Sequence, residues 1–224
     1  MKLKHFAVVL LFSGVLFGAN DAVRRLHESA EVITEIMGAS DKAIPQDLFD
    51  KAECLVVVPG VKKAAFIVGG KRGRGFISCR SHNGVGWSAP AAVTVEGGSV
   101  GFQIGVSETD VIMAVMNRRG VEKLLQSKFT LGADASVAAG PVGRTTSADT
   151  DAQMHAEILT WSRARGVFAG IALNGATLRP DDESNKDLYG TKTSNRDVIE
   201  HAKPPAGAEE LLNVLNKYSS HKGS

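Results

Sequence analysis

The feature that most constrains the fold of this chain is a series of short apolar runs between residues 54 and 116. The runs are rich in β-branched side chains and are broken by glycine and proline: CLVVVPG, AAFIVGG, GFISCR, VGWSAPAAVTVEGG, SVGFQIGVSETD and VIMAVMN. Short runs at such close spacing are typical of strands joined by hairpins. The segment therefore predicts a mainly antiparallel sheet, with turns at Pro59-Gly60 and at the basic stretch KRGR.

Helical patterns flank this region. Residues 21–38 place apolar side chains three and four positions apart, and a shorter helix is expected in AIPQDLFDKA. One helix, GVEKLLQSK, interrupts the strands, AEILTWSRARG and VFAGIALNGATL predict a further hairpin, and GAEELLNVLNKY predicts a closing helix. The sequence has no internal repeat and no linker. We therefore expect one α+β domain over residues 21–220, with a glycine-rich, barrel-like, mainly antiparallel sheet between N- and C-terminal helices.

The stretch KFTLGADASVAAGPVGRTT, residues 128–146, contains few large side chains. Glycine within a strand usually marks a bend, a bulge or the close approach of another backbone, and Pro141 favours an edge position because proline has no amide proton. No base lies near Ser136 in sequence, which disfavours a catalytic loop. We interpret the small residues as spacers that let two segments pack closely, and a shallow cavity for an acyl chain is a variant of this interpretation.

The N-terminal residues indicate a targeting segment. MKLKH is basic, and the apolar run over residues 6–19 is shorter than the roughly 20 residues that a membrane-spanning helix needs. This pattern is typical of a secretory signal peptide, here residues 1–19, with cleavage near Gly18 or Ala19. No cysteine precedes Cys54, so a lipid anchor is not expected. The pattern predicts a periplasmic or secreted protein, and an uncleaved membrane tether is the alternative.

The two cysteines, Cys54 and Cys79, are the only ones in the chain. Export would permit a disulfide between them. However, Cys54 begins one predicted strand and Cys79 ends another that is two strands later, so a simple meander would place them at opposite ends of the sheet. The sequence therefore favours two buried thiols over a disulfide.

Three motifs suggest enzyme, nucleotide or metal chemistry, and each lacks its required context. GGSVG matches the nucleophile-elbow pattern around Ser99, but the residues after it read as a strand rather than a helix. GGKRGRG lacks the G-K-[ST] ending of a phosphate-binding loop, and no helix follows it. The histidines are scattered without ligand spacing. We expect no enzyme activity, no cofactor and no metal site.

The distribution of charge is more informative than its total. The chain has 26 basic and 24 acidic residues, and loss of Lys2 and Lys4 with a signal peptide would leave 24 of each. Between Cys54 and Val95 there is no acidic residue, whereas six basic residues occur there: Lys62, Lys63, Lys71, Arg72, Arg74 and Arg80. Converging at one edge, these cations would attract phosphate headgroups at about 1 kcal/mol each. The alternative is an ordinary solvated sheet edge. Few aromatic residues are available to stack on bases, so nucleic acid is not an expected partner.

Several motifs together resemble those of the SYLF domain family. They are GWSAPA, GGSVGFQIG, LGADASVAAGPVGR, SRARGVFAGIALNGA and the trio Asn185, Tyr189 and Gly190, in order between about Ala43 and Tyr218. The resemblance implies a lipid-binding module without catalytic activity. Eukaryotic members of the family bind phosphoinositide membranes, and fungal members also bind actin and serve endocytosis.

Two differences from the family qualify this implication. Eukaryotic members often carry an SH3 or zinc-finger domain, and neither pattern is found here. Their membrane binding is associated with an N-terminal amphipathic helix, whereas residues 21–38 contain three glutamates and two arginines. This composition argues against strong electrostatic insertion of that helix into a membrane. An exported protein would also not meet actin in its own cell.

From these observations we expect an exported, non-enzymatic module that binds anionic phospholipid through its basic cluster. The alternative is a structural or protein-interaction role in the cell envelope, in which the basic edge contacts an acidic partner protein.

Overall fold

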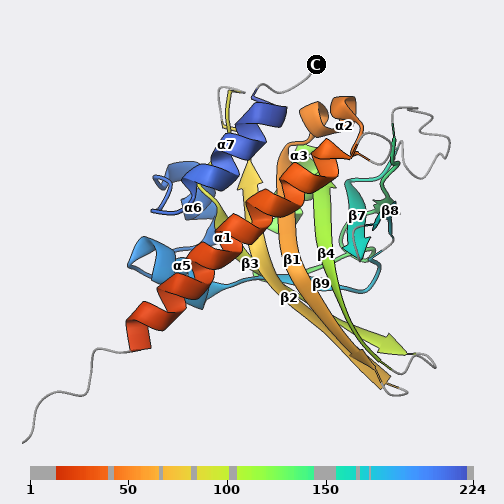
Figure 1. Ribbon diagram of the computed structural model, residues 1–224, viewed down its shortest axis with the longest axis horizontal. Helices are drawn as coiled ribbons and strands as arrows, with labels where there is room; N and C mark the ends of the chain where they lie inside the picture. Colours follow the sequence, from red (N-terminus) through yellow and green to blue (C-terminus); the bar gives the residue numbers. More distant parts are fainter. Residues whose placement is uncertain are drawn as a thin grey trace, which may run out of the picture.

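The computed structural model describes residues 14–39, 43–65, 68–81, 85–100, 105–143, 155–164, 167–171 and 173–220. The helices are α1 (Gly14–Gly38), α2 (Gln46–Lys51), α3 (Arg118–Leu124), α5 (Asp182–Tyr189), α6 (Asn195–His201) and α7 (Glu209–Tyr218). The strands are β1 (Cys54–Ala65), β2 (Val68–Cys79), β3 (Ala91–Val100), β4 (Gly105–Val115), β5 (Phe129–Thr130), β6 (Val137–Ala139), β7 (Ile158–Ala164), β8 (Val167–Gly170) and β9 (Thr177–Pro180). The predicted α+β domain with flanking helices is confirmed (Figure 1).

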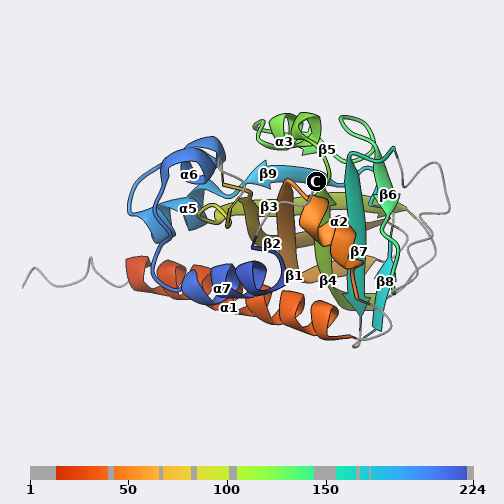
Figure 2. The ribbon, with the colours of Figure 1, turned by 90° about the horizontal axis from the view of Figure 1, so that it is seen from above.

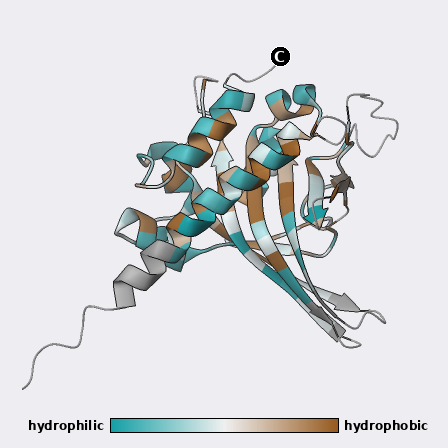
Figure 3. Cartoon of the chain, viewed as in Figure 1, coloured by the Kyte–Doolittle hydropathy of each residue, from teal (hydrophilic) through white to brown (hydrophobic). Residues whose placement is uncertain are grey.

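One curled sheet forms the centre of the molecule (Figure 2). Its strand order is β5-β9-β3-β2-β1-β4-β7-β6, and β8 also pairs with β7. Among the paired strands that the structure describes, only β6 and β7 run parallel. The sheet is therefore mainly antiparallel, as the short apolar runs predict. β1, β2 and β4 extend beyond the helices, where their residues become more hydrophilic (Figures 1 and 3).

Each face of the sheet carries its own hydrophobic core, because apolar residues alternate along the central strands. On one face α1 and α7 lie side by side, and their apolar sides pack with α2 on the sheet (Figure 2). That core includes Leu26, Ile33, Phe49, Leu55, Phe76, Trp161 and Leu215. On the other face, α3 and the edge strands β5 and β9 of the curled sheet contribute to a second core. That core includes Val56, Val58, Val61, Ile77, Met113, Leu124, Phe129 and Leu178.

β1 continues through Pro59-Gly60, so the predicted turn at this point is wrong. Instead, the register of β1 shifts between Val58 and Val61 against β4, which marks a β-bulge. Gly60 has φ +58°, and a bulge also accommodates proline, which cannot donate to the ladder. The KRGR stretch likewise lies inside β2 rather than in a turn. Two expected turns are thus internal to one long hairpin.

The long β1–β2 hairpin also corrects the cysteine prediction. Cys54 and Cys79 are direct partners in the register of β1 and β2, and they form a disulfide buried in the second core. The prediction of two buried thiols is wrong because it counted three strands between residues 54 and 79. With two strands, the start of β1 and the end of β2 meet at the same end of the sheet.

The small residues of the 128–146 stretch allow close approach, as predicted. A Cβ atom added to Gly140 would lie 2.0 Å from the indole ring of Trp161. The Trp161 indole N–H donates to the Pro141 carbonyl at 2.8 Å, so the chain lies directly against the ring. β6 forms the end of the sheet order, which agrees with the edge position expected from Pro141.

The motif residues Asn185 and Tyr189 have structural roles. The Asn185 side chain is fully buried, accepts a hydrogen bond from the Ala92 amide at 2.8 Å and donates one to Asn195 at 2.7 Å. The Tyr189 hydroxyl donates to the Pro90 carbonyl at 2.7 Å. These bonds satisfy buried polar groups and attach α5 and α6 to the edge of β3.

The predicted signal peptide, residues 1–19, lies mostly outside the described residues. Helix α1 begins at Gly14. Within the described part of the chain, no helix combines the length and apolar character needed to cross a membrane.

Candidate functional site

The six basic residues singled out in the sequence lie in three places. Lys62, Arg72 and Arg74 line a cavity on the face of the sheet that α1 covers. Lys63 and Lys71 alternate with these residues along β1 and β2, so their side chains face the opposite side. Arg80 lies just after β2, at the far end of the hairpin from the other five.

Arg80 serves as an internal anchor of the fold. Its guanidinium donates to the carbonyls of Phe49, Asp50 and Ala52 at 3.3 Å each, and to the Ser219 carbonyl at 2.7 Å. It also lies 3.9 Å from the ring centroid of Trp87. Its donors are occupied by the protein itself, so we assign Arg80 to the attachment of the C-terminal segment.

Lys71 is half-buried on the far face. A Cβ atom at Gly97 would lie 2.6 Å from Cε of Lys71, so the lysine stem lies against this glycine. Burial, and then the neighbouring charge of Lys63, lower the pKa of the Lys71 ammonium group. These two lysines are therefore separated from the α1 cavity by the thickness of the sheet.

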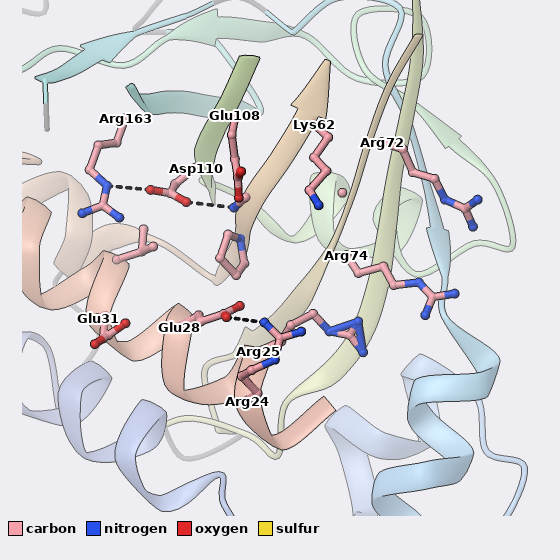
Figure 4. Close-up of a pocket in the computed structure, with 14 residues that line it drawn as sticks. Arg24, Arg25, Glu28, Glu31, Lys62, Arg72, Arg74, Glu108, Asp110 and Arg163 are labelled. Atoms are coloured by element: carbon pink, nitrogen blue, oxygen red, sulfur yellow. Dashed lines mark hydrogen bonds and ion pairs between the residues drawn. The ribbon is translucent and has the colours of Figure 1, made fainter. Parts of the chain in front are cut away.

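The cavity on the α1 face has a volume of about 480 Å³. It lies between α1, the bulge of β1, the middle of β2 and the adjoining part of β4 (Figure 4). Its charged lining residues are Arg24, Arg25, Glu28, Glu31, Lys62, Arg72, Arg74, Glu108, Asp110 and Arg163. Six basic and four acidic side chains thus share one cavity, which is suited to a polar and net anionic ligand.

The basic side of the cavity is held by residues of α5 and β3. Arg74 pairs with Asp181 at 3.3 Å and Glu183 at 3.6 Å. Arg25 donates to the Ser184 hydroxyl at 2.9 Å, and burial lowers the pKa of its guanidinium. Arg72 pairs with Glu96 at 3.4 Å, but both side chains are substantially exposed. Such an exposed pair contributes little and leaves Arg72 accessible to a ligand.

The acidic side of the cavity is organised around the bulge. One oxygen of Asp110 accepts the Gly60 amide at 2.8 Å, and the other accepts Nε of Arg163 at 2.5 Å. Burial raises the pKa of Asp110, although the Gly60 hydrogen bond acts in the opposite direction. Arg163 also pairs with Glu35 of α1. This network joins β1, β4, β7 and α1 around one wall of the cavity.

Helix α1 contributes a wall to the cavity, while its apolar side is used in the core. Leu26, Ile33 and Ile36 are fully buried against the sheet. The opposite side of the same turns presents Arg24, Arg25 and Glu28 to the cavity (Figure 4). In this structure these three apolar side chains are not exposed for insertion into a membrane.

Sequence reasoning missed half of the cavity's basic residues and all of its acidic ones. Arg24 and Arg25 belong to a helix outside the basic segment, and Asp110 and Arg163 belong to strands far apart in sequence. A signal was present in Pro59-Gly60, because these residues inside a strand-like run indicate a bulge, and bulges often re-aim neighbouring side chains.

The other motifs do not form a site in the described structure. The backbone of Ser99 lies within β3 and pairs with Gly69 of β2, so no strand-to-helix turn occurs there. Among the described residues, no group of three histidine, cysteine or acidic side chains is placed to hold a metal ion.

Comparison with known proteins identifies the family. Residues 96–218 match the sequence profile of the Ysc84 family, described as Las17-binding protein actin regulator. SH3 domain-containing YSC84-like protein 1 of Rattus norvegicus is 34% identical over 203 residues, which cover 90% of this chain and 58% of that protein. An SH3 domain-containing protein of Schizosaccharomyces pombe is 36% identical over 186 residues, covering 81% of this chain and 43% of that protein.

LAS seventeen-binding protein 3 of Saccharomyces cerevisiae is 30% identical over 185 residues, which cover 81% of this chain and 40% of that protein. The chain thus spans about half the length of the curated relatives that it matches. The names of the family and of these relatives describe binding and regulatory proteins.

These relatives overturn the predicted location. They are eukaryotic proteins of a mammal and of yeasts, and their names refer to SH3 domains and Las17 binding rather than to an exported or periplasmic protein. The prediction of a periplasmic or secreted protein is therefore wrong, and the objection to an actin-related role that rested on export no longer holds. The family profile covers more than half of the chain, and the resemblance seen in its motifs is confirmed: the chain belongs to the Ysc84 family of Las17-binding actin regulators, the family of the SYLF domain.

Proposed function

We propose that this domain binds anionic phospholipid headgroups in the cavity between α1 and the β1–β2 hairpin. The observation that carries the proposal is the convergence of Lys62, Arg72 and Arg74 with Arg24 and Arg25 of α1 on one cavity. The basic lining residues outnumber the acidic ones, which favours a net anionic ligand. Lys62 and Arg72 are exposed at the cavity and remain accessible to an incoming phosphate.

Vesicle co-sedimentation with a charge-matched pair of variants tests this proposal. The double variant Lys62→Gln/Arg72→Gln should weaken binding to anionic vesicles by about 2 kcal/mol, or roughly thirtyfold, because each cation contributes about 1 kcal/mol at such a surface. The control is Lys63→Gln/Lys71→Gln, which removes the same charge from neighbouring positions on the opposite face. The control should bind nearly as well as the wild type.

The comparison between the two double variants tells whether the lipid binds in the cavity or is attracted by the overall charge of the protein. An equal loss in both would indicate attraction by diffuse charge and would contradict recognition in the cavity. Binding that is equal on neutral and anionic vesicles would contradict the whole proposal.

A second candidate function is regulation of actin assembly through a protein partner. It is favoured by the family match, since both the family description and the yeast relative are named for Las17 binding. Pull-down of purified Las17 by the purified chain, in the absence of lipid, tests this candidate. Binding that survives Lys62→Gln/Arg72→Gln would assign the partner to a surface other than the cavity.

A further inference from the structure

Charges of both signs line the cavity. Figure 4 shows Arg72 and Arg74 toward one side and Asp110 with Arg163 toward the other, while Glu108 stands near Lys62 and Glu28 contacts the α1 arginines. A ligand with negative charge alone would satisfy the basic residues and be repelled by the acidic ones. A ligand with both signs of charge would satisfy both.

Most of these charges already have partners within the protein. Asp110 is occupied by Gly60 and Arg163, and Arg74 by Asp181 and Glu183. Arg24 pairs with Glu28 and Asp21 of its own helix. These groups shape the cavity, but they have limited capacity left for a ligand.

Lys62 and Glu108 differ from these paired residues because both remain accessible to a ligand. They are direct partners in the register of β1 and β4, and both are exposed at the cavity. Across the residues that the structure describes, neither side chain makes a hydrogen bond or an ion pair. The absence of a side chain at Gly60 makes room for Glu108, since a Cβ atom there would lie 2.7 Å from Glu108 Oε1. One accessible cation and one accessible carboxylate therefore stand side by side in the lining of the cavity.

We propose that the cavity recognises a phosphate ester that carries an amino acid group, as in a phosphoserine headgroup. Lys62 and Arg72 would bind the phosphate, Glu108 would accept the ammonium group, and Arg25 lies on the basic side for the carboxylate. In phosphoserine, two carbon atoms lie between the ester oxygen of the phosphate and the amine nitrogen. The phosphate and the ammonium group are therefore close enough together to contact neighbouring side chains on adjacent strands, such as Lys62 and Glu108. The inference rests on the proposed function and narrows its ligand class.

The carboxylates also bear on competing headgroups. A glycerol headgroup offers no cation to Glu108. A serine headgroup keeps a net negative charge and supplies the missing cation, so it fits the basic and acidic sides together.

Binding to vesicles that differ only in headgroup tests the inference. Phosphatidylserine and phosphatidylglycerol, each mixed into phosphatidylcholine at the same mole fraction, give surfaces of equal formal charge. The wild type should prefer the serine vesicles roughly fivefold, as expected for one partly exposed ion pair of about 1 kcal/mol. Glu108→Gln should bring this ratio to about one, and should strengthen binding to the glycerol vesicles because it removes a repelling charge.

The matched control is Glu122→Gln. Glu122 lies in α3, on the opposite side of the sheet, so this variant makes the same chemical change far from the cavity. It should keep the serine preference of the wild type. A serine preference that survives Glu108→Gln would overturn the assignment of Glu108. Equal binding of the wild type to both vesicles would overturn the inference and leave the proposed function standing.

Glycerophosphoserine, which has no acyl chains, distinguishes a lipid headgroup from a soluble ligand. Its competition with serine vesicles for the wild type, and a weaker competition for Glu108→Gln, would support recognition of the headgroup itself. If the chain binds neither kind of vesicle, the proposed function fails. In that case, titration of glycerophosphoserine decides the inference alone: Glu108-dependent binding supports it for a soluble ligand, and no binding overturns it.

Discussion

At the scale of single residues, glycine decides where segments of this chain approach one another. Gly140 lies against the buried Trp161 ring, and a Cβ atom at Gly170 would lie 2.1 Å from the Gly140 carbonyl oxygen. These contacts bring the end of β6 and the end of β8 together beside β7. The small side chains in this part of the sequence are therefore a packing requirement.

Substitution of Gly140 tests that requirement. Gly140→Ala should destabilise the fold by about 2 kcal/mol, because a methyl group must displace a fully buried indole ring. Gly98→Ala is the control, since Gly98 lies in β3 with no atom within 4 Å of its added Cβ. Urea denaturation of the two variants measures the difference. A Gly140→Ala variant as stable as the control would contradict the close-packing interpretation.

At the level of whole elements, helix α1 contributes both to a hydrophobic core and to the charged cavity. Its apolar side closes one core, and its polar side provides the arginines of the cavity wall. It is also joined to α7 by His27, whose ring lies 2.5 Å from the Glu210 carboxylate. The hydrogen bond and charge of Glu210 raise the pKa of His27 above its ordinary value of 6.5.

This contact predicts a pH dependence. A histidine with a raised pKa in the folded state stabilises the fold fully below its unfolded pKa of about 6.5, and this contribution is lost as the pH rises through the folded value. The thermal unfolding midpoint of His27→Gln should therefore fall below that of the wild type in acid and converge with it in alkali. Glu210→Gln should follow the same curve. A constant difference across pH would rule out the protonated His27 contact.

At the scale of the whole molecule, a few long-range contacts bind the ends of the chain to the sheet. The disulfide joins β1 to β2, and Arg80 joins the end of β2 to α2 and to Ser219 after α7. The Trp87 indole N–H also donates to the Ser219 carbonyl at 2.8 Å. The C-terminal segment is thus held by side chains from the middle of the sequence.

Loss of the Arg80 guanidinium should be costly. Arg80→Met keeps the aliphatic stem but leaves several carbonyl acceptors without a donor, and we expect a loss of about 3 kcal/mol in the free energy of unfolding. Arg72→Met is the control, because Arg72 has one exposed ion pair and should change stability by less than about 1 kcal/mol. Denaturant titration compares the two. Equal effects would contradict the anchoring role of Arg80.

Much of the fold could be predicted from local pattern. The helix over 21–38, the β7–β8 hairpin and the closing helix were found from apolar spacing, since each buries one side against the core. The strand boundaries at Pro59-Gly60 and KRGR were wrong, because turn residues inside long strands give the same local signal as true turns. The disulfide was missed for the same reason.

The pattern of short apolar runs is enough to predict a mainly antiparallel sheet, and the sequence also locates six basic residues in one segment. Which of these cations share a cavity depends on how the strands pair. The bulge at Pro59-Gly60 adds one residue to β1, so Val58 and Val61 face the same core and Lys62 faces α1. Because side chains alternate with a period of two, this single residue reverses the faces of Lys62 and Lys63, and Pro59-Gly60 reveals the reversal only once both residues are known to lie inside one strand.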